Sequence, residues 1–304
     1  MALPPSEWPG LMERIPAVAD LDELWDFDDP GASEARFRAA AKGADTNGDP
    51  GAADEARTQL ARAVGLQGRF DEGHTILDGV DATSAGRDRV QTRSLLERGR
   101  LLRSGGSETA SVAPFMRAWE LASAVGQEDL AVDAAHMLAI VDAPPGVDSW
   151  HARALGLADA SRDPKIRGWR ASLWNNFGWT RFERGDHAEA LEAFETALAA
   201  RRRRGGEREI RIAEWSVAKA LRLLGRLDEA LAIQERIAAE GAAAGDRDDG
   251  YVVEEMGECL MALGRAVEAR PHLVRAAELL AADPWLAEHE PDRIARLRSL
   301  AGLG

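Results

Sequence analysis

The side chains that could do chemistry in this chain match no familiar catalytic or metal-binding spacing. Its six histidines form no H-E-x-x-H motif and no H-x3-H pair. Asp133 and His136 share a face of an expected helix at i and i+3, but two ligands do not complete a metal site. Cys259 has no neighbouring base in sequence and reads as a small packed thiol. No G-x-x-x-x-G-K-[ST] phosphate loop is present. We therefore expect no metal, cofactor or catalytic residue.

Three glutamates in one short stretch point to a cationic neighbour. Glu254, Glu255 and Glu258 put like charges at i+3 and i+4 spacing, which slightly destabilises a bare helix. A cationic ligand would relieve that cost. Lys219 and Arg222, on the preceding expected helix, could relieve it from within the molecule instead. The sequence leaves both readings open.

The composition of the chain argues against several classes of protein. The chain has 304 residues, 45% of them hydrophobic and 30% charged, with a formal net charge of −14. So negative a chain repels a phosphate backbone, which argues against nucleic acid as a partner. No apolar run approaches the roughly 20 residues of a membrane span. The first ten residues, MALPPSEWPG, lack the pattern of a secretion signal, and the single cysteine suits a reducing cytoplasm. We expect a cytoplasmic protein.

The elements that position these side chains repeat along the chain. Glycines in similar contexts recur every 38 to 40 residues, at Gly68, Gly106, Gly146, Gly185, Gly225 and Gly264. Most stand in one phrase, a helix end, a glycine turn and an acidic first turn of the next helix, as in ERGDHAEALEAF over residues 183–194. Glycine supplies the left-handed conformation that ends a helix, and the acid favours the positive end of the next. The repeating unit is therefore a pair of antiparallel helices that covers its apolar face with the next pair.

The best-formed unit, residues 174–198, resembles the tetratricopeptide repeat. The residues that carry the resemblance are Trp174, Phe177, Gly178, Gly185, Ala190, Phe194 and Ala197. The unit around Gly257 and Gly264 matches nearly as well, and the others match in part. The resemblance implies an all-α, right-handed α-solenoid of six helix pairs over residues 50–282. Residues 1–49 are then an irregular segment with a capping helix, and 283–304 a connector with a second capping helix. Gly178 and Gly257 should pack against a neighbouring helix.

The sequence also predicts the bounds of the helices. These run over residues 52–67, 69–82, 87–104, 109–125, 127–142, 148–161, 165–184, 187–203, 207–224, 227–243, 250–263 and 266–281, with capping helices over 32–43 and 292–302.

In this family the first helix of each pair lines a concave groove, and the register implies which residues face it. The expected ligand-binding residues are Asn175, Asn176, Trp179, Trp215, Lys219, Arg222, Glu254, Glu255, Glu258, His136 and Arg100. Asn175 and Asn176 resemble the asparagines with which such repeats clamp a peptide backbone, since an amide side chain both donates and accepts. Trp179 and Trp215 should lie near each other. If one asparagine points into the neighbouring repeat, we expect it to be Asn176.

The favoured function is a non-catalytic adaptor or regulator that holds a protein or extended peptide in this groove. One alternative is a small-molecule sensor or enzyme with a closed pocket, in which Glu255 or Glu258 with a raised pKa acts as acid or base. Another is a scaffold that self-associates through its convex face. The sequence does not indicate the oligomeric state.

Overall fold

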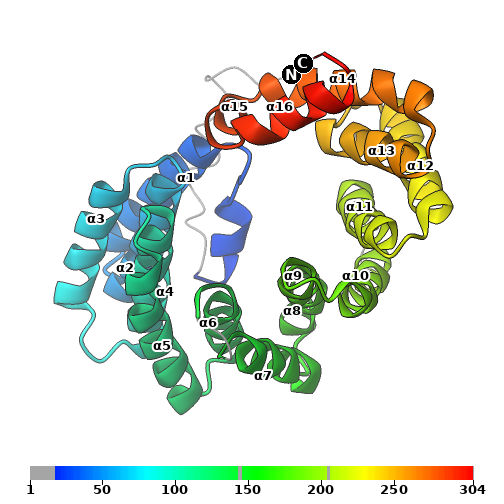
Figure 1. Ribbon diagram of the computed structural model, residues 1–304. Coiled ribbons are helices and arrows are strands. Elements are labelled where there is room, and N and C mark those ends of the chain that lie inside the picture. The colour runs from blue at the N-terminus through cyan, green and yellow to red at the C-terminus, as the bar shows by residue number, and fades with distance from the viewer. Residues whose placement is uncertain (1–17, 143–145, 204–205, 304) are drawn as a thin grey trace. The chain divides into compact units, whose positions relative to one another are not determined.

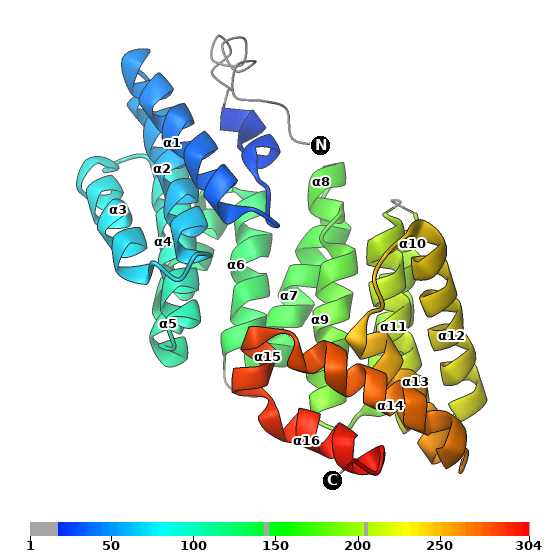
Figure 2. The ribbon, with the colours of Figure 1, turned by 90° about the horizontal axis from the view of Figure 1, so that it is seen from above.

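The computed structural model describes residues 18–142, 146–203 and 206–303, and these contain helices and no strand (Figures 1 and 2). The elements are η2 Val18–Leu24, α1 Pro30–Thr46, α2 Pro50–Gly65, α3 Phe70–Thr83, α4 Asp88–Ser104, α5 Glu108–Val125, α6 Glu128–Val141, α7 Gly146–Ala160, α8 Pro164–Arg167, α9 Arg170–Glu183, α10 His187–Arg202, α11 Glu207–Leu223, α12 Leu227–Ala244, α13 Gly250–Ala262, α14 Ala266–Ala281, α15 Pro284–His289 and α16 Pro291–Leu300. Within this described part, no helix is long and apolar enough to cross a membrane.

The chain divides into two compact units, unit 1 over Met1–Arg167 and unit 2 over Gly168–Gly304. In unit 1, α2 packs on α3, α4 on α5 and α6 on α7, and α1 covers the open side of α2. In unit 2 the pairs are α9 with α10, α11 with α12 and α13 with α14, and α16 covers α14. The predicted all-α stack of helix pairs is confirmed. The predicted boundaries at residues 49 and 282 stay a prediction.

Glycines end the first helices as the repeating phrase predicts. Gly68, Gly106, Gly185, Gly225 and Gly264 all have positive φ, between 76° and 84°. Glycine adopts this conformation without the clash that a side chain would bring, so the chain reverses within a few residues. Gly146 differs from this pattern, because it is the first residue of α7. The rest of that expected turn, residues 143–145, lies outside the described residues.

In three of the helix pairs, a large side chain of the second helix packs against a glycine of the first. A Cβ at Gly178 would stand 2.5 Å from the ring of Phe194, and one at Gly257 would stand 2.7 Å from Leu273. Phe194 and Leu273 are 1% and 0% exposed. Gly99 and Phe115 repeat the arrangement in unit 1. The close packing predicted at Gly178 and Gly257 is confirmed.

Helix bounds agree with the sequence to within about three residues, with two exceptions. The single helix expected over 165–184 is two, because α8 ends at Arg167 and α9 begins at Arg170. Gly168 stands at this break, and glycine is a poor helix former. The expected connector at 283–291 contains the short helix α15. Its first turn is capped by Asp283, which accepts hydrogen bonds from the backbone N–H groups of Trp285 and Leu286.

Candidate functional site

Three aromatic side chains form a row across the first helices of unit 2. Trp179 of α9 and Trp215 of α11 have ring centroids 5.7 Å apart. Trp215 and Tyr251 of α13 are 6.0 Å apart and meet edge to face. The Trp215 indole N–H also donates to the Tyr251 carbonyl oxygen at 3.2 Å. We call these three residues the aromatic row. The predicted proximity of Trp179 and Trp215 is confirmed.

The two tryptophans differ in how far they contribute to the hydrophobic core. Trp179 contacts Phe182 and Phe194 with ring centroids 5.2 Å and 5.0 Å away, so it packs against the main core of unit 2. Truncating Trp179 would therefore disturb packing as well as any ligand contact. Trp215 has no place in that core and is the cleaner residue for testing binding.

A buried carboxylate beside the row is neutralised from within the molecule. Glu255 is 1% exposed, and it accepts hydrogen bonds from Lys219 Nζ at 2.6 Å and Arg222 Nε at 2.7 Å. Lys219 Nζ also lies 5.1 Å from the centre of the Trp215 ring. Of the two readings left open by the sequence, the structure has the intramolecular pairing.

The protonation of Glu255 follows from these contacts. Burial alone would raise the pKa of its carboxyl, but the hydrogen bond from Arg222 and the charge of Lys219 outweigh burial and hold that pKa below its usual value. The raised pKa that an acid–base role requires is therefore not found at Glu255. Burial and the charge of Glu255 raise the pKa of the Cys259 thiol to about 12, so Cys259 stays protonated.

Glu254 and Glu258 are also paired, by arginines of the C-terminal capping helix, which the sequence analysis did not name as a source of cations. Glu254 accepts hydrogen bonds from Arg293 Nε, at 3.1 Å, and from Arg296 Nη2, at 3.2 Å. Arg296 also forms an ion pair with Glu258. Both arginines belong to α16, so the charges expected to face a ligand hold the C-terminal helix against α13.

The predicted asparagine pair lies on α9, one turn before Trp179. Asn175 Nδ2 lies 3.4 Å from Asn176 Oδ1, and both side chains are half-buried. The backbone carbonyl of Asn176 also accepts a hydrogen bond from Thr180. Which of the two amides meets a peptide stays a prediction.

Arg100 and His136 belong to unit 1, where Arg100 is paired with two carboxylates. Arg100 Nη1 donates to Glu97 at 2.7 Å, and its Nη2 donates to Asp133 Oδ2 at 2.6 Å. Burial opposes the charge on Arg100, but Asp133 and Glu97 outweigh it and raise the pKa of the guanidinium. Burial lowers the pKa of His136 to about 4, so its imidazole is neutral at pH 7. Their assignment to a ligand stays a prediction.

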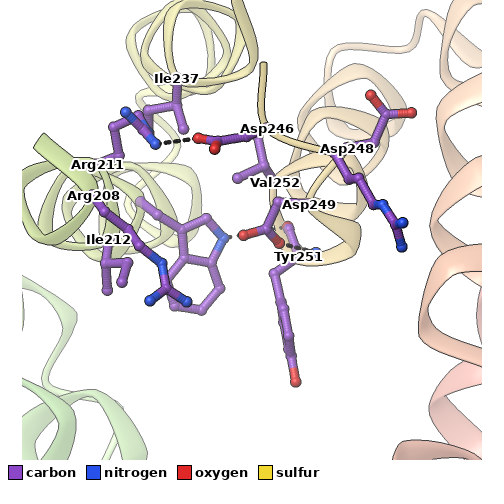
Figure 3. A pocket seen from close by; sticks show the side chains of 11 residues that line it. Arg208, Arg211, Ile212, Ile237, Asp246, Asp248, Asp249, Tyr251 and Val252 are labelled. Atoms are coloured by element: carbon purple, nitrogen blue, oxygen red, sulfur yellow. Dashed lines mark hydrogen bonds and ion pairs between the residues drawn. The ribbon is translucent and has the colours of Figure 1, made fainter. Parts of the chain in front are cut away.

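A cavity of about 570 Å³ lies beside the aromatic row in unit 2 (Figure 3). It is lined by Arg208, Arg211, Ile212, Trp215, Ile237, Asp246, Arg247, Asp248, Asp249, Tyr251 and Val252. Figure 3 shows Arg208 and Ile212 on the α11 side and Tyr251 on the α13 side. Of this set, the sequence analysis placed only Trp215 among the ligand-binding residues. Ile237 belongs to the second helix of a pair, and residues 246–249 belong to the α12–α13 loop. The sequence analysis considered only the first helix of each pair, so it could not identify these residues.

Comparison with known proteins agrees with this architecture. Residues 169–239 match the family model of the tetratricopeptide repeat. By sequence, this stretch consists of tetratricopeptide repeats. The matched stretch contains α9 to α11 and most of α12, and thus two members of the aromatic row. No curated protein matches the sequence.

Solved structures with low sequence identity share the fold of this chain. BtubC (BKLC) from P. vanneervenii has a TM-score of 0.58 at 16% identity, covering 75% of this chain and 94% of that one. A tetratricopeptide repeat protein from Parabacteroides merdae has a TM-score of 0.52 at 15% identity, covering 93% and 98%. The apo quorum sensor NprR from B. thuringiensis has a TM-score of 0.54 at 14% identity, covering 97% and 91%. At such identities the likeness concerns the fold alone.

Proposed function

We propose that this protein is a non-catalytic adaptor or regulator that holds a segment of a partner protein on the first-helix face of unit 2. By this face we mean the side chains of α9, α11 and α13 that surround the aromatic row. The observation that carries the proposal is the row itself, in which Trp179, Trp215 and Tyr251 lie side by side next to an open cavity. Aromatic side chains at such a place are the usual anchors of protein interfaces.

The expected affinity is modest. Two or three anchors at about 2 kcal/mol or more each, with backbone hydrogen bonds at roughly 0.5–1.5 kcal/mol apiece, must offset the cost of ordering the bound segment. A dissociation constant in the range of about 1 μM follows. Asn175 and Asn176 would supply the backbone contacts from α9, since each amide has one donor and one acceptor end.

The comparisons support this class of function. The quorum sensor NprR, whose fold matches over 97% of this chain with a TM-score of 0.55, has been solved in complex with its cognate peptide NprX. A tetratricopeptide-like stack is therefore able to hold a peptide, and by analogy we assign the same type of ligand to this chain.

A small-molecule sensor is the second candidate, and the cavity favours it. Its volume of about 570 Å³ lies within the range of roughly 300–1,000 Å³ that is usual for small-molecule sites. The enzyme version of this alternative loses its support at Glu255, whose pKa is lowered. Self-association through the opposite face would leave the aromatic row unused.

Capture of a partner by matched tryptophan variants tests the proposal. Immobilised wild type, Trp215→Ala and Trp285→Ala are each incubated with lysate of the native cell. Trp285 is a suitable control because it is 59% exposed and lies on α15. We expect Trp215→Ala to lose captured protein and Trp285→Ala to keep it, with both variants folded by circular dichroism. Equal capture by the two folded variants would refute the proposal.

A further inference from the structure

The cavity beside the aromatic row has an apolar floor. Ile212 and Trp215 contribute to it from α11, Ile237 from α12 and Val252 from α13. Apolar surface that lines an open cavity gains free energy when a side chain of a ligand displaces its water. The floor is therefore suited to an aliphatic or aromatic side chain.

The acidic residues around the cavity are already engaged. Asp246 pairs with Arg211, and Asp248 pairs with Arg275 at 3.0 Å. Asp249 caps α13, where its side chain accepts a hydrogen bond from the backbone N–H of Tyr251 at 2.8 Å. Two of the three carboxylates are therefore paired with arginines, and the third, Asp249, serves as a helix cap.

Two arginines that line the cavity have no acidic partner among the described residues. Arg208 and Arg247 are exposed, and neither forms an ion pair with any residue that the structure describes. The first turn of α13 also borders the cavity, and the positive end of a helix favours an anion. The acids in the first turn of α11, Glu207 and Glu209, do not line the cavity. Apart from Asp249, the lining charges without an ion-pair partner among the described residues are therefore positive.

The surface that begins at this rim is extended, as a chain-like ligand would require. The aromatic row continues from the cavity through Trp215 to Trp179 of α9, so the contact surface extends away from the cavity. An internal stretch of a partner, with one side chain in the cavity and its neighbours along the row, fits this layout.

Unit 1 shows how this chain accommodates a sequence in which acidic and apolar residues are mixed. Its own residues 21–27 read Leu-Asp-Glu-Leu-Trp-Asp-Phe. There the Trp25 indole N–H donates to Gln59 Oε1 at 3.2 Å, and the Arg62 guanidinium carbon lies 5.3 Å from the Trp25 ring and 5.5 Å from the Phe27 ring. An arginine and a glutamine of α2 thus hold the aromatic side chains of this segment in place.

We propose that the cavity takes an apolar side chain of the partner segment while Arg208 and Arg247 bind an acidic side chain next to it. This inference rests on the proposed function, and it names the chemistry of the partner. The protein as a whole is strongly negative, so general attraction does not favour an acidic ligand. Recognition of one must come from these two local cations.

The test uses a fluorescent peptide that copies residues 21–29, with both ends blocked, and a matched peptide in which every Asp and Glu is Asn or Gln. Anisotropy measures the binding of both peptides to the full-length protein. Because hydrogen bonds to charged groups are the stronger class, we expect the acidic peptide to bind about tenfold more tightly than the amide peptide. The preference should shrink as salt is raised.

Variants of the protein locate the effect. We expect an Arg208→Gln, Arg247→Gln double variant to lose about tenfold in affinity for the acidic peptide. Arg270→Gln, an exposed arginine of α14 that does not line the cavity, should bind like wild type. Equal binding of the two peptides, undiminished binding by the double variant, or no binding of either peptide would overturn the inference.

Trp215→Ala separates this inference from the proposed function. If wild type binds both peptides equally and Trp215→Ala binds neither, the first-helix face binds a segment but the charge preference is wrong. If Trp215→Ala binds the acidic peptide as wild type does, the peptide is held elsewhere and both proposals fail at this site.

Discussion

At the scale of single residues, the charged side chains near the aromatic row form ion pairs that join helices. Glu255 joins α13 to α11 through Lys219 and Arg222, and Glu254 joins α13 to α16 through Arg293. The sequence could indicate that three closely spaced glutamates need cations. It could not indicate which helix supplies the cations for Glu254 and Glu258, because α16 lies outside the repeat pattern.

Glu255→Gln tests this structural role. Removal of the carboxylate leaves Lys219 and Arg222 largely buried without their anion, so we expect a loss of about 3 kcal/mol in the free energy of unfolding. Urea denaturation at pH 7 measures it. Glu235→Gln, on an exposed position of α12, is the control and should change stability by less than about 0.5 kcal/mol.

The same pair of proteins predicts a dependence on pH. The pKa of the Glu255 carboxyl is lower in the folded protein than its ordinary value of 4.5. Its stabilising contribution is therefore complete above about pH 4.5 and is lost as the pH falls through the folded value. We expect the stability gap between wild type and Glu255→Gln to narrow on acidification below that pH. A gap that stays constant down to acid unfolding would contradict the ion-pair account.

At the scale of elements, much of the fold follows from the sequence. The repeat spacing of glycines predicts the helix pairs, since a turn glycine and an acidic first turn mark each junction locally. The sequence does not reveal the break at Gly168, because the buried Ile166 of α8 extends the apolar pattern of α9 backwards. The cavity was missed because it combines two first helices, one second helix and a loop, and no single periodic pattern contains all four.

Gly178→Leu tests the packing within a helix pair. A side chain at this position would meet the Phe194 ring, and such overpacking costs roughly 1–3 kcal/mol. Gly241→Ala is the matched control in α12, because the nearest atom to its added Cβ is 3.9 Å away. We expect the control to keep or slightly raise the urea midpoint. Equal midpoints for the two variants would mean that α9 and α10 do not meet as described.

At the scale of the whole molecule, the two units carry different first-helix faces. In unit 1, charged residues of α2, α4 and α6 satisfy one another, as in the bridges from Arg89 to Glu55 and Asp129. In unit 2, the corresponding helices present the aromatic row and the cavity. This contrast is the reason for assigning binding to unit 2, where the match to the family model also lies.

Arg100→Gln separates the roles of the units. The change leaves Glu97 and Asp133 without their shared cation, and we expect it to cost about 3 kcal/mol of stability. We expect the amount of partner captured per folded molecule to equal that of wild type. Capture is measured at low temperature, and circular dichroism gives the folded fraction. A folded Arg100→Gln variant that captures nothing would place a ligand contact in unit 1, as the sequence analysis expected.

Site-specific photo-crosslinking tests the central claim most directly. A photoreactive benzoylphenylalanine replaces Trp215 in one protein and Trp285 in another, and both are irradiated in the native cell. The account predicts a discrete crosslinked product at position 215, which mass spectrometry resolves to one segment of a partner, and none at position 285. Adducts at 285 alone, or an identical pattern at both positions, would contradict binding on the first-helix face of unit 2.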